Sequence, residues 1–511
     1  MTAQNSNLDK IEHIIVLMME NRSFDNVLGW LYDPDNPPPF NKTPNGTYNG
    51  VKSAMSNPGT NGEPVYVTKG TDTTAPYPDP NEPYEFVYRQ MYGQPPTMPI
   101  PNTTATPTMQ GFVIDYADAI ATADTEAQKK GKPPFDVDPS IIMNCFPPSA
   151  LPVINGLAQN YAVCDNWFSS VPTQTFPNRS FIHAATSSGN VYNTWKTGEH
   201  FWDVGVFINN TKTIFNLLEE NGVSWKIYHG GPLLLCNALI IQEQLWEFAF
   251  SRNRFFPYEQ FLSDLKTPGA LPAYTFIEPN MICSSKYGPE NDMHPAYAIF
   301  DHGPPTDALY GDKLIYDIYT ALINSDYWEK TLFIITFDEH GGCFDHFPTP
   351  PPPTVSPDGI VIPYTNGLNG GSGFDFTRFG VRVPAVLVSP WIAEGTICHT
   401  QFDHTSAIKT ISNKWLGGQN LTKRDAAACD VSEVLSLSTP RTDKPEITPV
   451  PPPAFTGCGD QSLSPLQRDL LAAAAQFVAN KTKRLIDLSA LDTKDKAVTT
   501  LDNISGELAA K

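Results

Sequence analysis

The sequence has none of the features that mark a membrane-spanning, signal-bearing or zinc-knuckle protein. It contains no run of about 18 apolar residues, so we expect no transmembrane helix. The first ten residues, MTAQNSNLDK, have neither the basic nor the apolar region of a secretory signal. The eight cysteines are widely scattered without a CxxC spacing, so we expect at most a few disulfides, and those only in an exported protein.

Positive charge is also scarce. The chain has 34 Lys and Arg against 54 Asp and Glu, which gives a formal net charge of −20. A nucleic-acid binder needs a basic surface, and charge alone would not hold this chain on an anionic membrane. We therefore expect no nucleic-acid partner, and the sequence predicts no stable protein partner.

Buried-strand patterns alternate with amphipathic helical patterns along the chain. The helical patterns between the strands fall at 151–159, 213–222 and 312–325. This alternation predicts an α/β fold whose central β-sheet is mostly parallel and sandwiched between helices. The apolar runs read as strands are HIIVLMM (13–19), NYAVCDNWF (160–168), VSWKIYHG (223–230), AYTFIEP (273–279), TLFIITFDEH (331–340) and VPAVLVSP (383–390).

Two changes in composition suggest how the chain is organised. Residues 34–110 are rich in Pro, Asn, Thr and Gly, which predicts a loop-rich insertion lying over the core. Residues 1–440 are otherwise predicted to form one large domain. Residues 441–511 are predicted to be a proline-rich connector and a C-terminal helical extension, in which Ser464 caps a helix that has Pro465 at its first position.

Two of the predicted strands end in oxygen-bearing side chains. Glu20 and Asn21 follow the first strand, and Asp338 and Glu339 follow the run at 331–337. Ligands of open α/β sheets bind beyond the carboxyl ends of the strands, so parallel neighbouring strands would bring these side chains together. Carboxylates gathered in a cleft repel one another, and a divalent cation would offset that repulsion. The alternative is that they only cap loops.

Two further stretches carry polar side chains suited to catalysis. In SSVPTQTFPNRSF (169–181), Thr175 offers a hydroxyl, and Asn178 and Arg179 offer hydrogen-bond donors for an anionic transition state. The plain alternative for this stretch is a capped helix start. In DEHGGCFDHF (338–347), paired glycines allow a close backbone approach, and His346 is a metal ligand, a proton donor or a histidine with only a structural role.

Five motifs occur in a fixed order: MMENRSFDNVLG, TFPNR, ENDMHP, DEHGGCFDHF and GVRVPAVLVSPW. Together they resemble the phosphoesterase family that contains bacterial and plant phosphatidylcholine-preferring (non-specific) phospholipases C and related acid phosphatases. The resemblance runs from about residue 10 to about residue 435. It implies a fold similar to that of alkaline phosphatase, with the central sheet sandwiched between helices and loop-rich insertions.

The resemblance also implies an active site. One divalent metal ion, whose identity stays open among Ca, Zn, Mn, Fe and Mg, would bind to the two side-chain pairs at the strand ends. Thr175 resembles the family nucleophile, Asn178 would bind phosphoryl oxygens, and His294 resembles a phosphate-contacting or proton-transferring histidine. The expected metal ligands are Glu20, Asn21, Asp338 and Glu339, and the other expected substrate contacts are His229, Arg179 and His346.

The sequence departs from the family pattern at three positions. Gln174 and Phe176 flank the threonine where relatives often carry Pro and His, and Phe86 stands where relatives often carry His. These departures put the substrate pocket in question. A two-metal arrangement is the alternative to one ion, because further carboxylate and imidazole groups are available, although the resemblance favours one metal. The candidates for a second site are Asp345, His346, His294 and His404.

The reaction implied is that of a phospholipase C, which would hydrolyse phosphatidylcholine-type phosphodiesters to diacylglycerol and a phosphorylated head group through a covalent phosphothreonine. An acid phosphatase acting on soluble phosphomonoesters is the first alternative, and a catalytically silent, metal-stabilised binding protein is the second. A phospholipid substrate implies transient contact with a membrane surface, for which the candidates are aromatic loops at 28–34, 199–207 and 252–261. Localisation stays open: the composition favours secretion or the periplasm, and the cytoplasm is the alternative.

Overall fold

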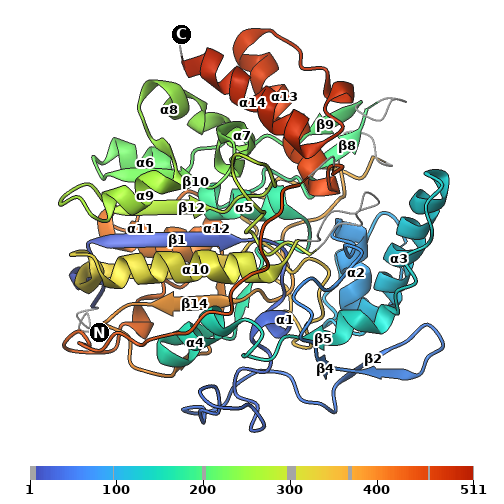
Figure 1. Ribbon diagram of the computed structural model, residues 1–511, viewed down its shortest axis with the longest axis horizontal. Coiled ribbons are helices and arrows are strands. Elements are labelled where there is room, and N and C mark those ends of the chain that lie inside the picture. Colours follow the sequence, from blue (N-terminus) through green and yellow to red (C-terminus); the bar gives the residue numbers. More distant parts are fainter. Residues whose placement is uncertain are drawn as a thin grey trace.

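A central sheet of eight strands crosses the part of the chain that the structure describes (Figure 1). The computed structural model describes residues 7–95, 97–197, 203–295, 306–365, 371–458 and 461–509. In order across the sheet, the strands are β11 (Phe255–Pro257), β10 (Trp225–His229), β12 (Tyr274–Glu278), β1 (His13–Met19), β13 (Thr331–Phe337), β14 (Ala385–Val388), β6 (Ala162–Cys164) and β15 (Thr396–Cys398).

The sheet is mostly parallel. Only β14 runs against its neighbours, pairing antiparallel with both β13 and β6. Each apolar run read as a strand contains one, although the run at 160–168 is divided into β6 and β7 (Trp167–Phe168). β1 and β13 are buried along almost their whole length, as expected for parallel strands covered on both faces. The expected fold class is confirmed.

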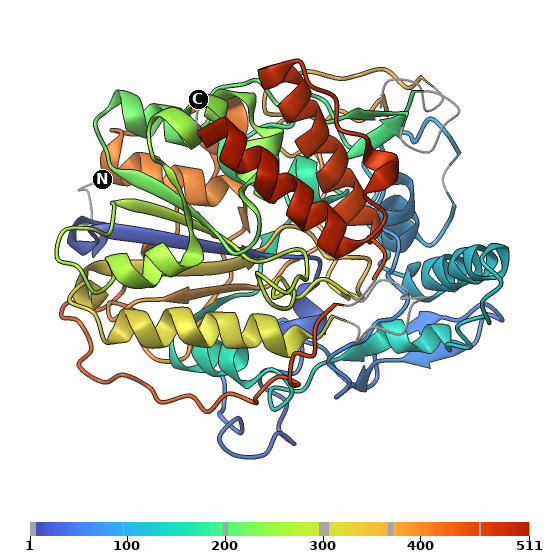
Figure 2. The same cartoon turned by 45° about the horizontal axis from the view of Figure 1, so that its top comes forward.

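Helices cover both faces of the sheet, as the sequence predicts. α4 (Pro152–Asn160) and α10 (Ala308–Ile323) pack together on one side. α5 (Thr175–Ala184), α6 (Ile214–Glu220), α7 (Asn237–Ile241) and α11 (Thr405–Trp415) form the opposite layer. Figure 2 shows the two layers with the strands between them.

The insertion lies beyond the end of the sheet toward which β1 points, at the right of Figure 1. It contains β2 (Ser56–Pro58), β3 (Pro64–Tyr66), β4 (Thr68–Lys69) and α2 (Tyr84–Tyr92). It shares a small apolar core of its own with α3 (Phe112–Lys129). The predicted insertion is therefore partly regular and packs where the strands deliver the candidate site residues.

The C-terminal helices pack against the main body. α13 (Pro465–Thr482) begins as predicted, with the Ser464 hydroxyl accepting from the Gln467 amide and Pro465 at the first position. α14 (Lys494–Ala509) follows, and a disulfide joins Cys283 to Cys458. Within the described residues, every helix is too short or too polar to cross a bilayer. The division at residue 440 stays a prediction.

Candidate active site

The parallel pairing of β1 with β13 brings the two predicted acidic segments together. Met19 is paired with Phe337, so the next residues of both strands leave the sheet at the same level. The backbone amides of Asn21 and Glu339 both donate to Oδ1 of Asp338, at 3.0 and 2.7 Å. Glu20 and the other three side chains are fully buried. The sequence predicted this meeting, and the register explains it.

The backbone at Asn21, Gly341 and Gly342 accepts few other residue types. Asn21 has a φ of 54°, a left-handed conformation that asparagine adopts more readily than most residues. Gly341 has a φ of 60°, and a Cβ placed there would lie 2.2 Å from the carbonyl oxygen of Asn21. A Cβ on Gly342 would lie 2.6 Å from Pro80 of the insertion. The glycine pair thus lets the loop after β13 pass between β1 and the insertion.

Arg179 supplies the positive charge closest to the acidic group. Its guanidinium pairs with Glu20 Oε1 at 3.0 Å and with Asp338 Oδ2 at 3.4 Å, and all three side chains are fully buried. Burial raises the pKa of Glu20 and Asp338 raises it further, while Arg179 lowers it; the pKa stays well above its usual range. One arginine therefore does not fully compensate these carboxylates.

The buried oxygens that lack hydrogen bonds are consistent with a divalent cation. Asn21 Oδ1 and Glu339 Oε1 accept no hydrogen bond from any described residue, and Asp338 Oδ2 has only the ion pair with Arg179. Leaving such atoms unsatisfied is costly, and carboxylate and amide oxygens are the donors that hard cations take. Burial, Glu82 and Asp338 all raise the pKa of Glu339, which reflects the same shortage of positive charge.

Thr175 lies beside this group at the start of α5. It is the first helical residue, its side chain is fully buried, and its Oγ1 is 3.5 Å from Glu20 Oε2. The N-terminal end of a helix favours negative charge, so this position suits a hydroxyl that becomes an alkoxide or carries a phosphoryl group. The predicted nucleophile and the predicted metal ligands thus share one buried location.

Asn178 has a different set of contacts from those expected. Its Nδ2 donates to the carbonyls of Val171, Thr173 and Gln174 at 2.8 to 3.1 Å, and its Oδ1 accepts from the Val171 amide. These bonds use the whole carboxamide. The side chain therefore fixes the turn that precedes Thr175.

His294 lies among carboxylates, next to Asn21. Its Nε2 is 3.0 Å from Asn21 Nδ2 and 3.5 Å from Glu82 Oε1, and its Nδ1 is 3.8 Å from Asp79 Oδ1. Burial lowers the pKa of His294, but Asp79 and Glu82 outweigh burial and hold that pKa well above its usual range. The two carboxylates thus favour the protonated imidazolium, whereas the contact with Asn21 Nδ2 is a hydrogen bond only when Nε2 carries no proton.

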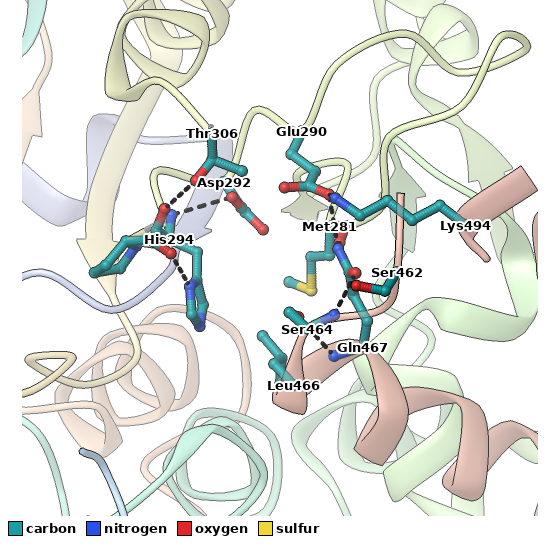
Figure 3. A pocket seen from close by; sticks show the side chains of 11 residues that line it. Met281, Glu290, Asp292, His294, Thr306, Ser462, Ser464, Leu466, Gln467 and Lys494 are labelled. Carbon is teal, nitrogen blue, oxygen red and sulfur yellow. Dashed lines mark hydrogen bonds and ion pairs between the residues drawn. The ribbon is translucent and has the colours of Figure 1, made fainter. Parts of the chain in front are cut away.

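Figure 3 shows His294 and Asp292 on one side of a small cavity and residues of the C-terminal helices on the other. Across the cavity, Lys494 of α14 and Gln467 of α13 both donate to Glu290 Oε1, at 2.6 and 2.7 Å. Glu290 belongs to the same loop as His294. The C-terminal helices therefore contact the loop that carries this histidine.

The sequence interpretation missed Asp79 and Glu82. Both come from PYPDPNEPY in the insertion, and Glu82 Oε1 accepts from Asn21 Nδ2 at 2.5 Å. With His294 they form a group whose ligand atoms all lie within 4.8 Å of one another and that could hold a metal ion. Two acids between prolines were a signal, but loop residues have no periodicity that would direct them to the site.

The other expected histidines have partners other than Thr175. His346 Nδ1 is 2.6 Å from Asp25, and Arg382 binds both Asp25 and Asp345; these three acidic and imidazole side chains form a group of their own that could hold an ion. His404 Nε2 lies 2.6 Å from the carbonyl oxygen of Asp338. The four residues suggested for a second metal site are therefore distributed over three locations.

His229 ends β10 and hydrogen bonds through Nδ1 to the carbonyl of Gly231 at 2.7 Å. Burial lowers its pKa, and the nearest charges that raise it belong to Glu259 and Asp502. Neither of these acids belongs to the group around Thr175. No contact between described residues joins His229 to Thr175 or to Glu20.

Comparison with known proteins identifies the family. The model of the phosphoesterase family matches residues 11–416. The chain belongs to the phosphoesterase family. Non-specific phospholipase C4 of Arabidopsis thaliana is 35% identical over 480 residues, 91% of this chain and 79% of the relative. Non-specific phospholipase C3 of the same plant is 33% identical over 508 residues, 95% of this chain and 86% of the relative.

These relatives confirm the resemblance seen in the motifs, and this member of the phosphoesterase family is a phosphoric ester hydrolase. Among solved structures, a protein in the alkaline phosphatase superfamily from Vibrio parahaemolyticus matches with a TM-score of 0.29 and 12% identity. The match covers 65% of this chain and 81% of that one.

Proposed function

We propose that this phosphoesterase is a phospholipase C that hydrolyses phosphatidylcholine-type phosphodiesters through a covalent phosphothreonine. One observation carries the proposal: the Thr175 hydroxyl lies 3.5 Å from Glu20, at the end of the sheet where buried oxygens lack hydrogen bonds. A nucleophilic hydroxyl next to a site for a cation is the arrangement that phosphoryl transfer requires.

In the proposed reaction, Thr175 Oγ1 attacks phosphorus and passes its proton to Glu20 Oε2, 3.5 Å away, as the bond from phosphorus to the diacylglycerol oxygen breaks. Glu20 orients the hydroxyl, and Arg179 orients Glu20 through the ion pair at 3.0 Å. Asn178 fixes the turn before Thr175 instead of contacting the phosphoryl group, since backbone carbonyls and an amide use all its polar atoms. Water then attacks phosphorus and the bond from phosphorus to Thr175 Oγ1 breaks; the water oxygen leaves with the phosphorylated head group, and a proton returns to Oγ1.

His294 is proposed to protonate the departing diacylglycerol oxygen. The proposal is supported by the raised pKa of this histidine beside Asp79 and Glu82. Glu20, Asn21, Asp338 and Glu339 would hold one divalent ion, which supplies positive charge to the phosphoryl oxygens and lowers the pKa of the hydroxyl. No catalytic step is assigned to His229 or His346, because His229 contacts Gly231 and His346 contacts Asp25.

The relatives support a lipid substrate, since both are named phospholipases C. The structure does not favour the stretch at 28–34 as a membrane contact, because Leu28, Trp30 and Leu31 are buried in the core. Phe255 in the stretch at 252–261 is buried as well. Residues 199–202 lie outside the described residues. The disulfide between Cys283 and Cys458 supports work in an oxidising compartment, outside the cytoplasm.

The test compares two soluble chromogenic substrates. We expect p-nitrophenylphosphorylcholine, a phosphodiester, to be hydrolysed with a kcat/KM at least ten times that of p-nitrophenyl phosphate, a monoester. Diacylglycerol should then appear when the protein is given phosphatidylcholine in mixed micelles. A higher kcat/KM on the monoester, without diacylglycerol release, would favour the acid phosphatase instead.

A further inference from the structure

A proline-rich loop, residues 348–365, exposes apolar side chains and almost no charge. Its 18 residues, PTPPPPTVSPDGIVIPYT, include a single charged one, Asp358. Val355, Ile360 and Val361 have exposed fractions of 41%, 43% and 42%, and they are three of the seven large hydrophobic side chains exposed in the described part of the chain. Exposed apolar residues gathered in one short segment mark a surface that contacts something.

Hydrogen bonds from neighbouring segments hold the backbone of the proline-rich loop in place. Arg424 donates through Nε to the carbonyl of Val355 at 2.6 Å, and the Lys423 amide donates to the carbonyl of Pro357 at 3.0 Å. Asp358 accepts from the Thr186 hydroxyl and from the Ile360 amide, so its charge is directed inward. The apolar side chains are thus presented on a fixed support.

The segments that hold the proline-rich loop are close in the chain to Thr175 or pack against its turn. Thr186, which holds Asp358, lies two residues beyond the end of α5, the helix that begins at Thr175. Phe374 and Phe376, which follow the loop along the chain, pack in one apolar cluster with Val171 from the turn before Thr175. The proline-rich loop and the catalytic turn therefore belong to one connected part of the molecule.

The charge of the surface indicates the kind of partner. The loop has no Lys or Arg, and the whole chain has a formal net charge of −20, so attraction to an anionic surface is excluded as the driving force. Apolar side chains on an uncharged loop suit insertion into the interface of a neutral or zwitterionic lipid layer. A phosphatidylcholine bilayer has that chemistry and would also supply the proposed substrate.

We propose that Val355, Ile360 and Val361 insert into the surface of a zwitterionic phospholipid bilayer and hold the active site against it. This inference rests on the proposed phospholipase function, because a soluble phosphomonoester would not require such a surface. Binding then depends on buried apolar area and changes little with salt concentration.

The experiment measures cosedimentation of the full chain with phosphatidylcholine vesicles. In the triple variant Val355→Ser/Ile360→Ser/Val361→Ser, we expect the vesicle partition coefficient and the hydrolysis of vesicle phosphatidylcholine to fall at least tenfold. The kcat/KM on soluble p-nitrophenylphosphorylcholine and the melting temperature should stay at wild-type values, which shows that the fold is intact. The matched control is Leu485→Ser, at a side chain that is 84% exposed outside the loop, and it should change neither reading.

Wild-type binding that requires phosphatidylserine and disappears in 0.5 M salt would overturn the inference, as would a triple variant that binds like wild type. Self-association that the triple variant loses, without any vesicle binding, would identify the loop as a contact between copies and would also overturn it. Failure of the proposed function would give a different result. The wild-type protein would then hydrolyse neither p-nitrophenylphosphorylcholine nor vesicle phosphatidylcholine, while vesicle binding, which needs no catalysis, would still test the loop.

Discussion

The Oγ1 atom of Thr175 lies 3.5 Å from the Oε2 atom of Glu20, although 155 positions separate them in the sequence. The two residues reach this distance by different routes. Glu20 leaves the carboxyl end of β1, whereas Thr175 begins α5 after a turn that Asn178 fixes. A strand end and a helix start thus place an acid and a hydroxyl face to face in a fully buried position.

Replacing Thr175 tests whether its hydroxyl is the nucleophile. Thr175→Ala should lower kcat on p-nitrophenylphosphorylcholine by at least 10³-fold, because no other hydroxyl is proposed to form the intermediate. Thr175→Ser keeps a hydroxyl and should retain measurable turnover. Stopping the wild-type reaction in acid should leave a phosphorylcholine adduct on the peptide with Thr175, detectable by mass spectrometry. Near wild-type turnover in Thr175→Ala, with an unchanged melting temperature, would refute the role.

Removal of metal tests the oxygen group at the ends of β1 and β13. Treatment with a chelator should abolish hydrolysis and lower the melting temperature, because the buried carboxylates then lose the charge that offsets their repulsion. Adding back one divalent ion per chain should restore both. Asp338→Asn should need about 10- to 100-fold more metal for half-maximal recovery.

Asp72→Asn is a suitable control for this experiment, because Asp72 is exposed and belongs to the same insertion as Glu82. It should recover at the wild-type metal concentration. Full activity in protein that elemental analysis finds free of metal would contradict the prediction, whatever the variants do.

The sequence predicted the meeting of β1 and β13 because parallel buried strands leave a strong apolar signal and their ends are punctuated by polar residues. The direction of β14 was not predictable, because an apolar run of buried residues reads the same whichever way the strand runs. Asp79 and Glu82 were missed because the proline-rich segment has no period of 2 or 3.6. The contacts of Asn178 could not be predicted either, because its carboxamide can hydrogen bond to the backbone of a turn or to a phosphate.

The stability of the fold should depend on pH through Asp115 of α3. This side chain is 1% exposed, accepts from Gln90 Nε2 at 2.8 Å, and burial raises its pKa to about 7. An unfolded aspartic acid titrates near 3.9, so between pH ~4 and ~7 the folded chain holds a proton that the unfolded chain releases. The contribution of Asp115 to stability therefore falls as pH rises through this window.

Asp115→Asn removes this penalty and should be more stable than wild type at pH 8, by on the order of 2–4 kcal/mol. The difference should vanish near pH 4. Urea unfolding at both pH values measures it, and Asp118→Asn, on the exposed side of the same helix, is the control. Equal destabilisation of Asp115→Asn at both pH values would show that the side chain contributes only its hydrogen bonds.

Substitutions of Arg179 test whether this residue stabilises the fold or binds the substrate. Its guanidinium is the buried partner of Glu20 and Asp338 and also donates to the carbonyls of Met18 and Met19. Arg179→Met leaves two carboxylates without that partner and should cost about 3–5 kcal/mol in the metal-free protein. Arg179→Lys keeps the charge but loses the forked pair of N–H donors, so its stability should lie between those of wild type and Arg179→Met.

The control is Arg252→Met, which breaks an ion pair with Glu219 in which the Arg252 side chain is 53% exposed, and such surface pairs contribute at most about 1 kcal/mol. Urea unfolding in the presence of chelator gives the comparison. Bound metal should reduce the loss in Arg179→Met, because the ion and the guanidinium offset the same negative charge. An Arg179→Met protein of wild-type stability but raised KM would instead mean that this arginine acts on the substrate and that Glu20 needs no cationic partner.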